Sequence, residues 1–341
     1  MEKTFLAFAR DMGAANTVVP IAIQLRTLGH TVFICLDQGG KAVEQYPSFT
    51  AVYQPAYFNY LLGQRKVDAI LNGLSSPRGD LELWLDANAP LLRDTPLLVQ
   101  CEDYWGAHTR SRVAPDALIT IDNTARRLAR AAGVRSRICT AGFAGVSPVD
   151  PSAHIQLVMQ QHRAQTPGVQ ILVYPDGGPE CELALPRLVE SILQTRAPVM
   201  LVPKFHPKFK KVRHPRGGTW DQWCRQQLVP LYNADKVIDV EGPTNQVIAC
   251  ADGVASGYST LLMRPATTGK LALTLWDGAV ETELRKETGL AQTPLMLQRK
   301  RFPYLTSVMP LDEFFTVAQP TLALPPLQPG KAADFVLSLL T

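Results

Sequence analysis

Two loops in the second half of the chain contain residues that could hold a phosphate group. Gly177 and Gly178 separate an apolar run from a helical pattern. Further along, small and hydroxyl residues precede another helical pattern: Ser256, Gly257, Ser259 and Thr260. Backbone N–H groups at the start of a helix attract anions, and glycine lets a phosphate approach the backbone closely. The alternative is that these residues form plain turns and cap helices.

Cationic side chains lie near these loops in the sequence. Lys204 and His206 follow an apolar run that ends at residue 202. An imidazole changes charge near neutral pH, so it can donate to a phosphate or transfer a proton, although an isolated His is more often an ordinary surface or core residue. Residues 208–216 are better interpreted as a solvated basic loop. Arg264, about one helical turn beyond Thr260, either reaches the same phosphate or is exposed.

The loop after the first apolar run is a third candidate. It reads Asp11-Met-Gly13-Ala-Ala-Asn16 and leads into a helical pattern, where amides and the helix dipole favour an anion. The alternative is that Gly13 allows close packing and Asn16 caps the helix. The chain has neither a Gly-x-Gly-x-x-Gly fingerprint nor a Walker A motif, which argues against a nicotinamide or P-loop site.

The elements that position these loops follow from alternating apolar and amphipathic stretches. Apolar runs at 4–9 and 31–36, with an amphipathic run at 17–28 between them, form a βαβ pattern with buried parallel strands. The same alternation predicts further strands at 69–71, 97–100, 117–121, 136–140, 170–174, 198–202, 236–240, 253–256 and 270–275. Helical patterns accompany them at 81–92, 123–132, 153–164, 181–193, 244–250, 261–268 and 332–340.

The length and a proline-rich hinge predict two domains. The 341 residues are roughly twice the usual domain length, and two prolines with an Asp-Pro step interrupt the pattern at 146–151. We therefore predict Rossmann-like domains at 1–150 and 151–325, followed by a linker and helix at 326–341. Open parallel sheets bind ligands beyond the carboxyl ends of their strands. The expected fold class is α/β, with two doubly wound domains facing a central cleft.

The composition excludes several classes of protein. The 34 Lys and Arg residues against 30 Asp and Glu residues give a net charge of +4, which is too small and too dispersed to favour nucleic acid as a partner. No apolar run is long enough for a transmembrane segment, and charged residues follow the N-terminus too soon for a signal peptide, so a cytoplasmic protein is expected. The six cysteines lie far apart and match neither a disulfide framework nor a zinc site.

Short motifs along nearly the whole chain resemble the superfamily of GT-B glycosyltransferases and UDP-N-acetylglucosamine 2-epimerases. In order, the matching pieces are Asp11-x-Gly13-Ala-Ala-Asn16, Leu25-x-x-x-Gly29-His30, Ser75-Ser76, Asp103-Tyr-Trp105, Pro115-Asp116, Gly133, Gly142, Gly178, Asp252-x-Val-x-Ser256-x-x-Ser259-Thr260 and Gly269-Lys270. The step His206-Pro207 is also similar to the His-Pro motif of transferases that use CMP- or CDP-linked donors. The order and spacing of the motifs carry the resemblance.

The resemblance implies that the C-terminal domain holds a nucleotide donor. Gly177 and Gly178 would then lie under the donor, His206 would meet its phosphate or base, and the pyrophosphate would rest at Ser259 and Thr260. Many members that use UDP-sugars have a Glu followed by Ala in the next helix, where this chain has Arg264-Pro265-Ala266. An Arg suits a donor with an additional anionic group.

The resemblance also implies that the N-terminal domain supplies the acceptor site and the base. The acceptor-side carboxylates would be Asp11 and either Glu102 or Asp103, with Asp11 as the first candidate for the base. A solvated loop is the alternative interpretation of the Glu102-Asp103 pair. Helix N-termini, together with Lys204 and His206, would neutralise the diphosphate, so neither a metal nor another cofactor is expected, and the chain has no Asp-x-Asp motif.

The expected reaction is an inverting transfer of a glycosyl or related group from a nucleotide-activated donor to a small-molecule or glycan acceptor. Two alternatives remain open. One is a nucleotide-sugar epimerase or hydrolase, which needs acid and base groups on both faces of the sugar. The other is a catalytically inactive nucleotide-binding protein of the same fold. Trp220, Trp223 and Tyr232 form either a core cluster or a contact patch, the latter consistent with a homodimer.

Overall fold

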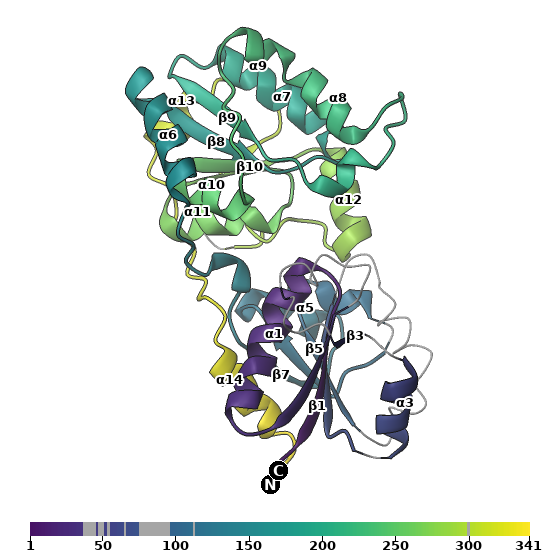
Figure 1. Cartoon of the computed structure of the whole chain (residues 1–341). Coiled ribbons are helices and arrows are strands. Elements are labelled where there is room, and N and C mark those ends of the chain that lie inside the picture. The colour runs from purple at the N-terminus through teal and green to yellow at the C-terminus, as the bar shows by residue number, and fades with distance from the viewer. Residues whose placement is uncertain are drawn as a thin grey trace. The chain divides into compact units, whose positions relative to one another are not determined.

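The chain forms two compact units in a computed structural model (Figure 1). The structure describes residues 1–36, 46, 51–52, 55–64, 66–74, 96–111, 113–298 and 301–341. The N-terminal unit comprises 1–147, 287–289 and 324–341, and the C-terminal unit comprises 148–286 and 290–323. Within these residues, each unit forms one parallel β-sheet. The predicted fold class of two parallel-sheet α/β domains is confirmed.

The sheet of the N-terminal unit has the strand order β3-β2-β1-β4-β5-β6-β7 within the described residues. The strands are β1 (Thr4–Ala9), β2 (Thr31–Leu36), β3 (Ala51–Val52), β4 (Ala69–Gly73), β5 (Leu97–Cys101), β6 (Ala117–Thr120) and β7 (Arg137–Thr140). From β1 the chain moves to β2 and β3 on one side, then returns to β4 on the other. The order of strands therefore reverses between β1 and β4, where open parallel sheets form a binding crevice.

The sheet of the C-terminal unit repeats this arrangement with the order β12-β11-β10-β8-β9, as far as the structure describes the chain. Its strands are β8 (Gln170–Tyr174), β9 (Val199–Pro203), β10 (Gly253–Ser256), β11 (Leu271–Leu275) and β12 (Tyr304–Leu305). All neighbouring pairs are parallel, and β8 has β9 on one side and β10 on the other. The reversal in this unit lies between β8 and β10.

Helices connect these strands. The α-helices of the N-terminal unit are α1 (Met12–Thr27), α3 (Pro55–Gly63), α5 (Asn123–Ala131) and α14 (Pro329–Leu337). Those of the C-terminal unit are α6 (Ala153–Gln165), α7 (Cys181–Gln194), α8 (Trp220–Gln227), α9 (Val229–Asn233), α10 (Thr244–Cys250), α11 (Met263–Thr268), α12 (Gly278–Thr288, whose last two residues group with the N-terminal unit) and α13 (Asp312–Thr316). Single 3₁₀ turns include η3 (Ala107–Arg110), η4 (Ala144–Val146), η5 (Pro207–Lys210) and η6 (Thr260–Leu262).

Three stretches differ from the elements expected from the sequence. Helix α1 begins five residues earlier than expected, because Asp11 caps it by accepting the amide of Ala14 at 2.9 Å. Residues 236–240 do not form a strand; they make only a bridge from Val237 to Leu201 beside the edge strand β9. The helix expected at 261–268 is divided into η6 and α11. The predicted helix at 81–92 and the Ser75-Ser76 motif lie outside the described residues.

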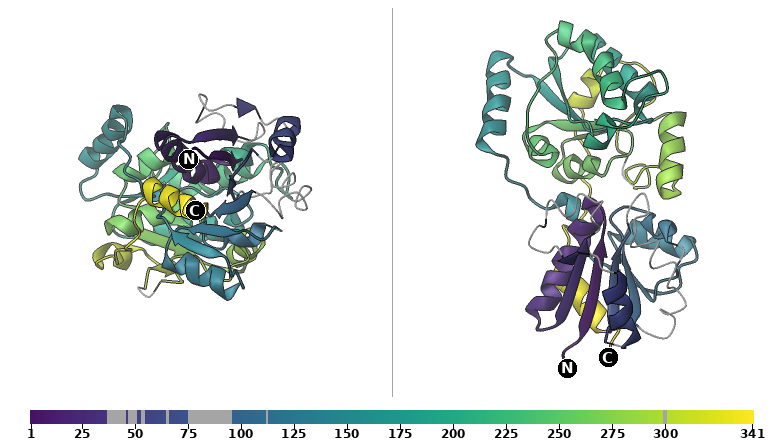
Figure 2. Two further views of the ribbon diagram at one scale, coloured as in Figure 1. Left: turned by 90° about the horizontal axis from the view of Figure 1, so that it is seen from below. Right: turned by 45° about the vertical axis from the view of Figure 1, so that its right-hand side comes forward.

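The C-terminal helix α14 belongs to the core of the N-terminal unit. Ala332, Ala333 and Val336 are fully buried in the same hydrophobic cluster as the apolar side of α1. The two helices run side by side against the sheet, and both termini of the chain lie at the same end of this unit (Figures 1 and 2). The segment that the sequence analysis separated as 326–341 is thus packed into the first sheet domain, because its small apolar face covers α1.

In the C-terminal unit, the predicted aromatic segment lies mainly in the core. Trp220 and Trp223 are buried, and the ring of His214 stacks on Trp223 with centroids 5.2 Å apart. Tyr232 is partly exposed, and its hydroxyl donates to Asp239 at 3.1 Å. For the residues described, no helix is both long enough and apolar enough to cross a membrane.

Candidate functional site

The acidic residues of the N-terminal unit lie at the carboxyl ends of β1 and β5. Asp11 follows β1, and Asp103 lies two residues beyond the end of β5. A Cβ atom added to Gly13 would overlap the Oδ2 atom of Asp103, so the carboxylate of Asp103 reaches the first turn of α1. Only glycine leaves room for that approach. The structure therefore brings Asp11, Gly13 and Asp103 together next to the reversal of the sheet.

Asp103 is held in an environment that disfavours its charged form. Its side chain is 13% exposed and lies 3.4 Å from Nη1 of Arg110, which also donates to the carbonyl of Leu74 at 3.2 Å. Burial and then the charge of Asp11 raise the pKa of Asp103 to about 7, while Arg110 opposes the shift. A carboxyl group with this pKa exchanges its proton near neutral pH, as a general base or acid must.

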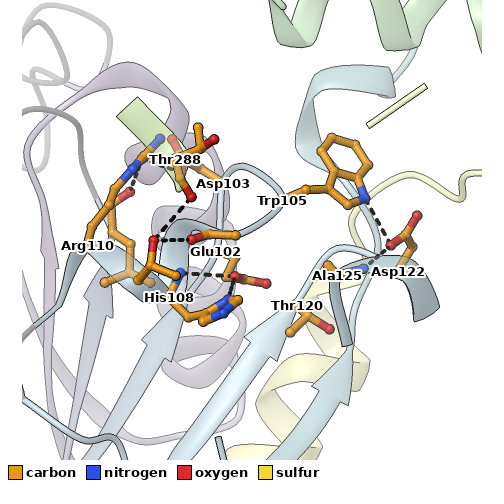
Figure 3. Close-up of polar contacts among 12 residues, drawn as sticks. Glu102, Asp103, Trp105, His108, Arg110, Thr120, Asp122, Ala125 and Thr288 are labelled. Carbon is orange, nitrogen blue, oxygen red and sulfur yellow. Dashed lines mark hydrogen bonds and ion pairs between the residues drawn. The ribbon is translucent and has the colours of Figure 1, made fainter. Parts of the chain in front are cut away.

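Glu102 points away from this cluster into the protein. Its buried Oε1 atom accepts both the backbone N–H of His108, at 3.1 Å, and the ring atom Nδ1 of His108, at 2.6 Å (Figure 3). Burial raises the pKa of Glu102, and the contacts with His108 oppose this. Oε2 of Glu102 and Nε2 of His108 have no hydrogen-bond partner in the described part of the chain.

The 3₁₀ turn η3 holds the two adjacent carboxylates with two different side chains. His108 binds Glu102, and Arg110 binds Asp103. Because Oε1 of Glu102 already accepts a backbone N–H, the proton shared with His108 belongs on Nδ1. The sequence alone does not predict a role for His108, which is marked there only by its position six residues after Glu102.

Asn16 has a structural partner. It lies in the second turn of α1, so it does not cap the helix, and its Oδ1 accepts the hydroxyl of Tyr46 at 2.9 Å. In the loops after β5 and β6, the indole N–H of the buried Trp105 donates to Asp122 at 3.0 Å, and Asp122 also caps α5 by accepting the amide of Ala125 (Figure 3). These contacts fix the loops that follow β5 and β6.

In the C-terminal unit, the predicted phosphate-binding loops meet at the carboxyl ends of β8 and β10. Asp176, which follows β8, accepts the hydroxyl of Ser256 and the amide of Gly257, both at 2.6 Å. The Ser256 oxygen in turn accepts the amide of Ser259 at 3.1 Å. Two of the predicted phosphate ligands are therefore already bonded to a carboxylate. Sequence reasoning missed this role of Asp176, because an Asp before two glycines is an ordinary turn residue.

The glycines of this loop approach other protein groups closely. A Cβ atom on Gly178 would overlap the ring of Phe209, and the amide of Gly178 donates to Oε1 of Glu180 at 3.1 Å. A Cβ atom on Gly177 would also contact Phe209. Close packing against Phe209 is thus one physical reason for the two glycines, beside the phosphate cradle expected from the sequence.

The hydroxyl of Ser259 caps the short turn that begins at Thr260. It accepts the amide of Leu261 at 3.3 Å, which bears out capping as one role of this residue. Arg264 follows in α11 and is half-buried, and this burial lowers its pKa.

Lys204 and His206 differ in their surroundings. The Lys204 ammonium donates to the carbonyls of Val240, at 3.1 Å, and Gly242, at 2.8 Å, and burial lowers its pKa. Lys204 therefore fastens the 240–242 loop to the end of β9. His206 is exposed, and its ring lies edge-on to Phe209 with centroids 6.2 Å apart. Among the residues described, no group of three or more His, Cys, Asp or Glu side chains could hold a metal ion.

Comparison with known proteins identifies the fold. No protein-family model and no curated protein sequence matches the chain. Solved structures do match it: Anabaena HepE in complex with UDP and glucose has 12% identity and a TM-score of 0.56, over 99% of this chain and 90% of that one. A putative UDP-N-acetylglucosamine 2-epimerase from Listeria monocytogenes has 10% identity and a TM-score of 0.58, over 99% and 95% of the two chains.

MurG of Acinetobacter baumannii is similar to a comparable extent, with 14% identity and a TM-score of 0.51 over 100% of this chain and 91% of that one. At such identities the similarity establishes the fold. The two-domain fold that the resemblance implies is confirmed.

Proposed function

We propose that this protein is an enzyme that transfers a glycosyl or related group from a nucleotide-activated donor to a hydroxyl group of a small molecule or glycan. The observation that carries the proposal is the Asp103 carboxyl, whose pKa is about 7, set beside Asp11 and the start of α1. A group with that pKa suits the deprotonation of an acceptor hydroxyl. The N-terminal unit supplies this chemistry, and the C-terminal unit binds the donor.

Asp103 is the proposed base, and Asp11 is its positioning neighbour. The sequence analysis ranked Asp11 first, but Oδ1 of Asp11 accepts the amide of Ala14 as the cap of α1. The charge of Asp11 raises the pKa of Asp103 and so prepares it to take a proton. Attack of the resulting alkoxide on the sugar carbon, opposite to the departing nucleotide, would invert the configuration at that carbon.

The proposed donor site lies at the ends of β8 and β10. Support comes from the hydroxyl groups of Ser259 and Thr260 at a turn start, from the neighbouring cation Arg264, and from HepE, a protein of this fold solved with UDP and glucose. The exposed His206 is the proposed contact for the phosphate or base of the donor. We propose that these groups stabilise the departing nucleotide without a metal, so treatment with EDTA should leave the rate unchanged.

Calorimetry with UDP-glucose, GDP-mannose, dTDP-glucose and CDP-glycerol tests the donor site. At least one should bind, and the combined Ser259→Ala and Thr260→Ala substitutions should weaken it, whereas Thr316→Ala, an exposed hydroxyl residue of the same unit, should not. The bound donor is then incubated with hydroxyl acceptors, and nucleotide release is followed. If no compound of the set binds, the proposal is wrong.

A second candidate function is epimerisation or hydrolysis of the nucleotide sugar. It is favoured by the similarity in fold to a putative UDP-N-acetylglucosamine 2-epimerase and by the two neighbouring carboxyl groups of Asp11 and Asp103. Epimerisation needs proton transfer on two faces of the sugar. Incubation with donor alone distinguishes the two functions, because an epimerase or hydrolase consumes donor without an acceptor and a transferase does not.

A further inference from the structure

Asp176 places a buried carboxyl group in the region that is proposed to bind the diphosphate of the donor. Its two carboxylate oxygens accept the Ser256 hydroxyl and the Gly257 amide, both at 2.6 Å. It immediately precedes Gly177 and Gly178 at the point where the strand order of the sheet reverses. Any phosphate held by these loops would lie close to this carboxylate. Two negative groups at such a distance repel each other strongly where water is excluded.

The surroundings of Asp176 already disfavour its charge. Both Asp176 and Glu180 are only 7% exposed. Burial, and then the charge of Glu180, raise the pKa of Asp176 to about 7, whereas the bonds from Ser256 and Gly257 oppose the shift. Near neutral pH the Asp176 carboxyl is therefore partly protonated in the free protein.

The other titratable groups around Asp176 do not offset its charge. Tyr174 and Cys181 interact with it from β8 and from the start of α7, and burial raises the pKa of each well above its usual value, so both are neutral. On the β9 side, Lys204 directs its ammonium to the carbonyls of Val240 and Gly242. His206 lies against Phe209 with its ring exposed.

We propose that Asp176 is a specificity-determining residue of the donor site, one that must carry a proton when a nucleoside diphosphate ester binds. The proposal rests on the proposed function, since it requires a donor at the ends of β8 and β10. Binding then transfers one proton from the buffer to the Asp176 carboxylate. The protonated group no longer repels the diphosphate, and it keeps its bonds to Ser256 and Gly257.

The proposal sets a direction for the pH dependence of binding. Below the pKa of Asp176 in the free protein, about pH 7, the proton is already present and the Kd should not change with pH. Above that pH each binding event takes up a proton, so the Kd should rise by up to about tenfold per pH unit. A carboxamide at position 176 imitates the protonated acid, since its oxygen accepts the Gly257 amide and its NH₂ donates to the Ser256 oxygen.

The experiment is titration calorimetry of the full chain with whichever of UDP-glucose, GDP-mannose, dTDP-glucose and CDP-glycerol binds. These esters lack the phosphate monoester proton, whose pKa is about 6, so the ligand does not contribute a proton of its own. Measurements at pH 6 and pH 7.5, each in two buffers of different ionisation enthalpy, give the number of protons taken up. Asp176→Asn is the test variant, and Asp239→Asn changes an exposed carboxylate of the same unit as its control.

The wild-type protein and the control should take up about half a proton or more at pH 7.5 and much less at pH 6. Asp176→Asn should take up none and should bind equally well at both pH values. Binding by the wild type without proton uptake, or uptake retained in Asp176→Asn, would overturn the proposal. If that variant does not fold, the wild-type Kd is the test: a Kd that does not rise above pH 7 would overturn the proposal. If no ester binds at either pH, the proposed function itself is wrong, and the proposal about Asp176 falls with it.

Discussion

Each unit places a buried acidic residue two positions beyond the carboxyl end of a strand, Asp103 after β5 and Asp176 after β8, but surrounds it differently. Asp103 lies beside another carboxylate, Asp11, and makes one ion pair at 3.4 Å with Arg110. Asp176 also has an acidic neighbour, Glu180, yet two short bonds from Ser256 and Gly257 hold it in place. In both cases burial and a like charge raise the pKa to about 7.

The difference lies in what else the carboxylate does. Within the described residues, Asp103 is engaged by its own backbone N–H and by one long ion pair, so its carboxylate retains capacity to accept a hydrogen bond from a substrate. The two oxygens of Asp176, by contrast, join two loops. The same elevated pKa therefore supports proton transfer in one unit and control of binding in the other. A perturbed pKa marks a site of interest, but the hydrogen bonds around the group decide its role.

The largest effect is expected from Asp103→Asn. An amide cannot take the proton of the acceptor, so kcat should fall by roughly 10²–10⁴-fold. The donor Kd should stay within about twofold, because the donor site belongs to the other unit. Steady-state kinetics and calorimetry on the same preparation measure both quantities. Equal losses of kcat and donor affinity would show that Asp103 does not act as the base.

Removal of the Asp176 side chain should affect stability instead. Asp176→Ala leaves the Ser256 hydroxyl and the Gly257 amide buried without an acceptor, which should cost about 2–4 kcal/mol of unfolding free energy. Asp103→Ala should cost clearly less than this, since Arg110 keeps its hydrogen bonds to the carbonyls of Leu74 and Glu287 and the repulsion from Asp11 is relieved. Urea denaturation of the two variants and the wild type compares these values. If both Ala variants lost the same unfolding free energy, Asp176 would not be the more structural of the two carboxylates.

Substitution of one glycine in each unit should show the same contrast between stability and turnover, with smaller effects. In Gly178→Ala the new Cβ overlaps the Phe209 ring inside the core, so a loss of about 1–3 kcal/mol is expected. In Gly13→Ala the new Cβ overlaps Oδ2 and crowds Cγ and Cβ of Asp103, so the Asp103 side chain has to turn away. That variant should keep its stability within about 1 kcal/mol yet lose much of its turnover, because the base is displaced. Thermal unfolding and kcat check the pair.

Much of the fold could be predicted from the sequence. Buried parallel strands are short and continuously apolar, so β1 and β8 coincide with the expected ranges. Residues 236–240 are apolar enough for a strand, but only two backbone bonds join them to Leu201 at the sheet edge. The partner of α14 depends on contacts nearly the length of the chain apart, which no local pattern contains.

The candidate site was predicted only in part. The proximity of Asp11, Gly13 and Asp103 follows from a general rule, because carboxyl ends of parallel strands meet at one edge of a sheet. His108 and Asp176 escaped notice because their importance comes from partners brought near by folding: the buried Glu102 for one, and Ser256 with Gly257 for the other. Ser256 and Gly257 were selected as phosphate ligands from their residue types, which do not reveal that a carboxylate already accepts their hydrogen atoms.

The smallest effect should be seen in the pH dependence of kcat/KM for the donor, to which both Asp103 and Asp176 contribute. A base must be deprotonated to act, so kcat should rise with pH through about 7 as Asp103 loses its proton. Donor affinity should fall above the same pH, because Asp176 must then gain a proton. The value of kcat/KM for the donor should therefore pass through a maximum near neutral pH and decline by up to about tenfold per pH unit on either side.

Two variants test whether the acid side of this pH profile comes from Asp103 and the alkaline side from Asp176. Asp176→Asn should remove the alkaline decline and leave the acid side in place, because the donor then binds without a proton while Asp103 still titrates. Asp11→Asn should move the acid side to lower pH, since it takes away a negative charge that raises the pKa of Asp103. If Asp176→Asn altered the acid side instead, the carboxylates of the two units would not act independently, and the separation into a proton-transfer group and a binding group would have to be abandoned.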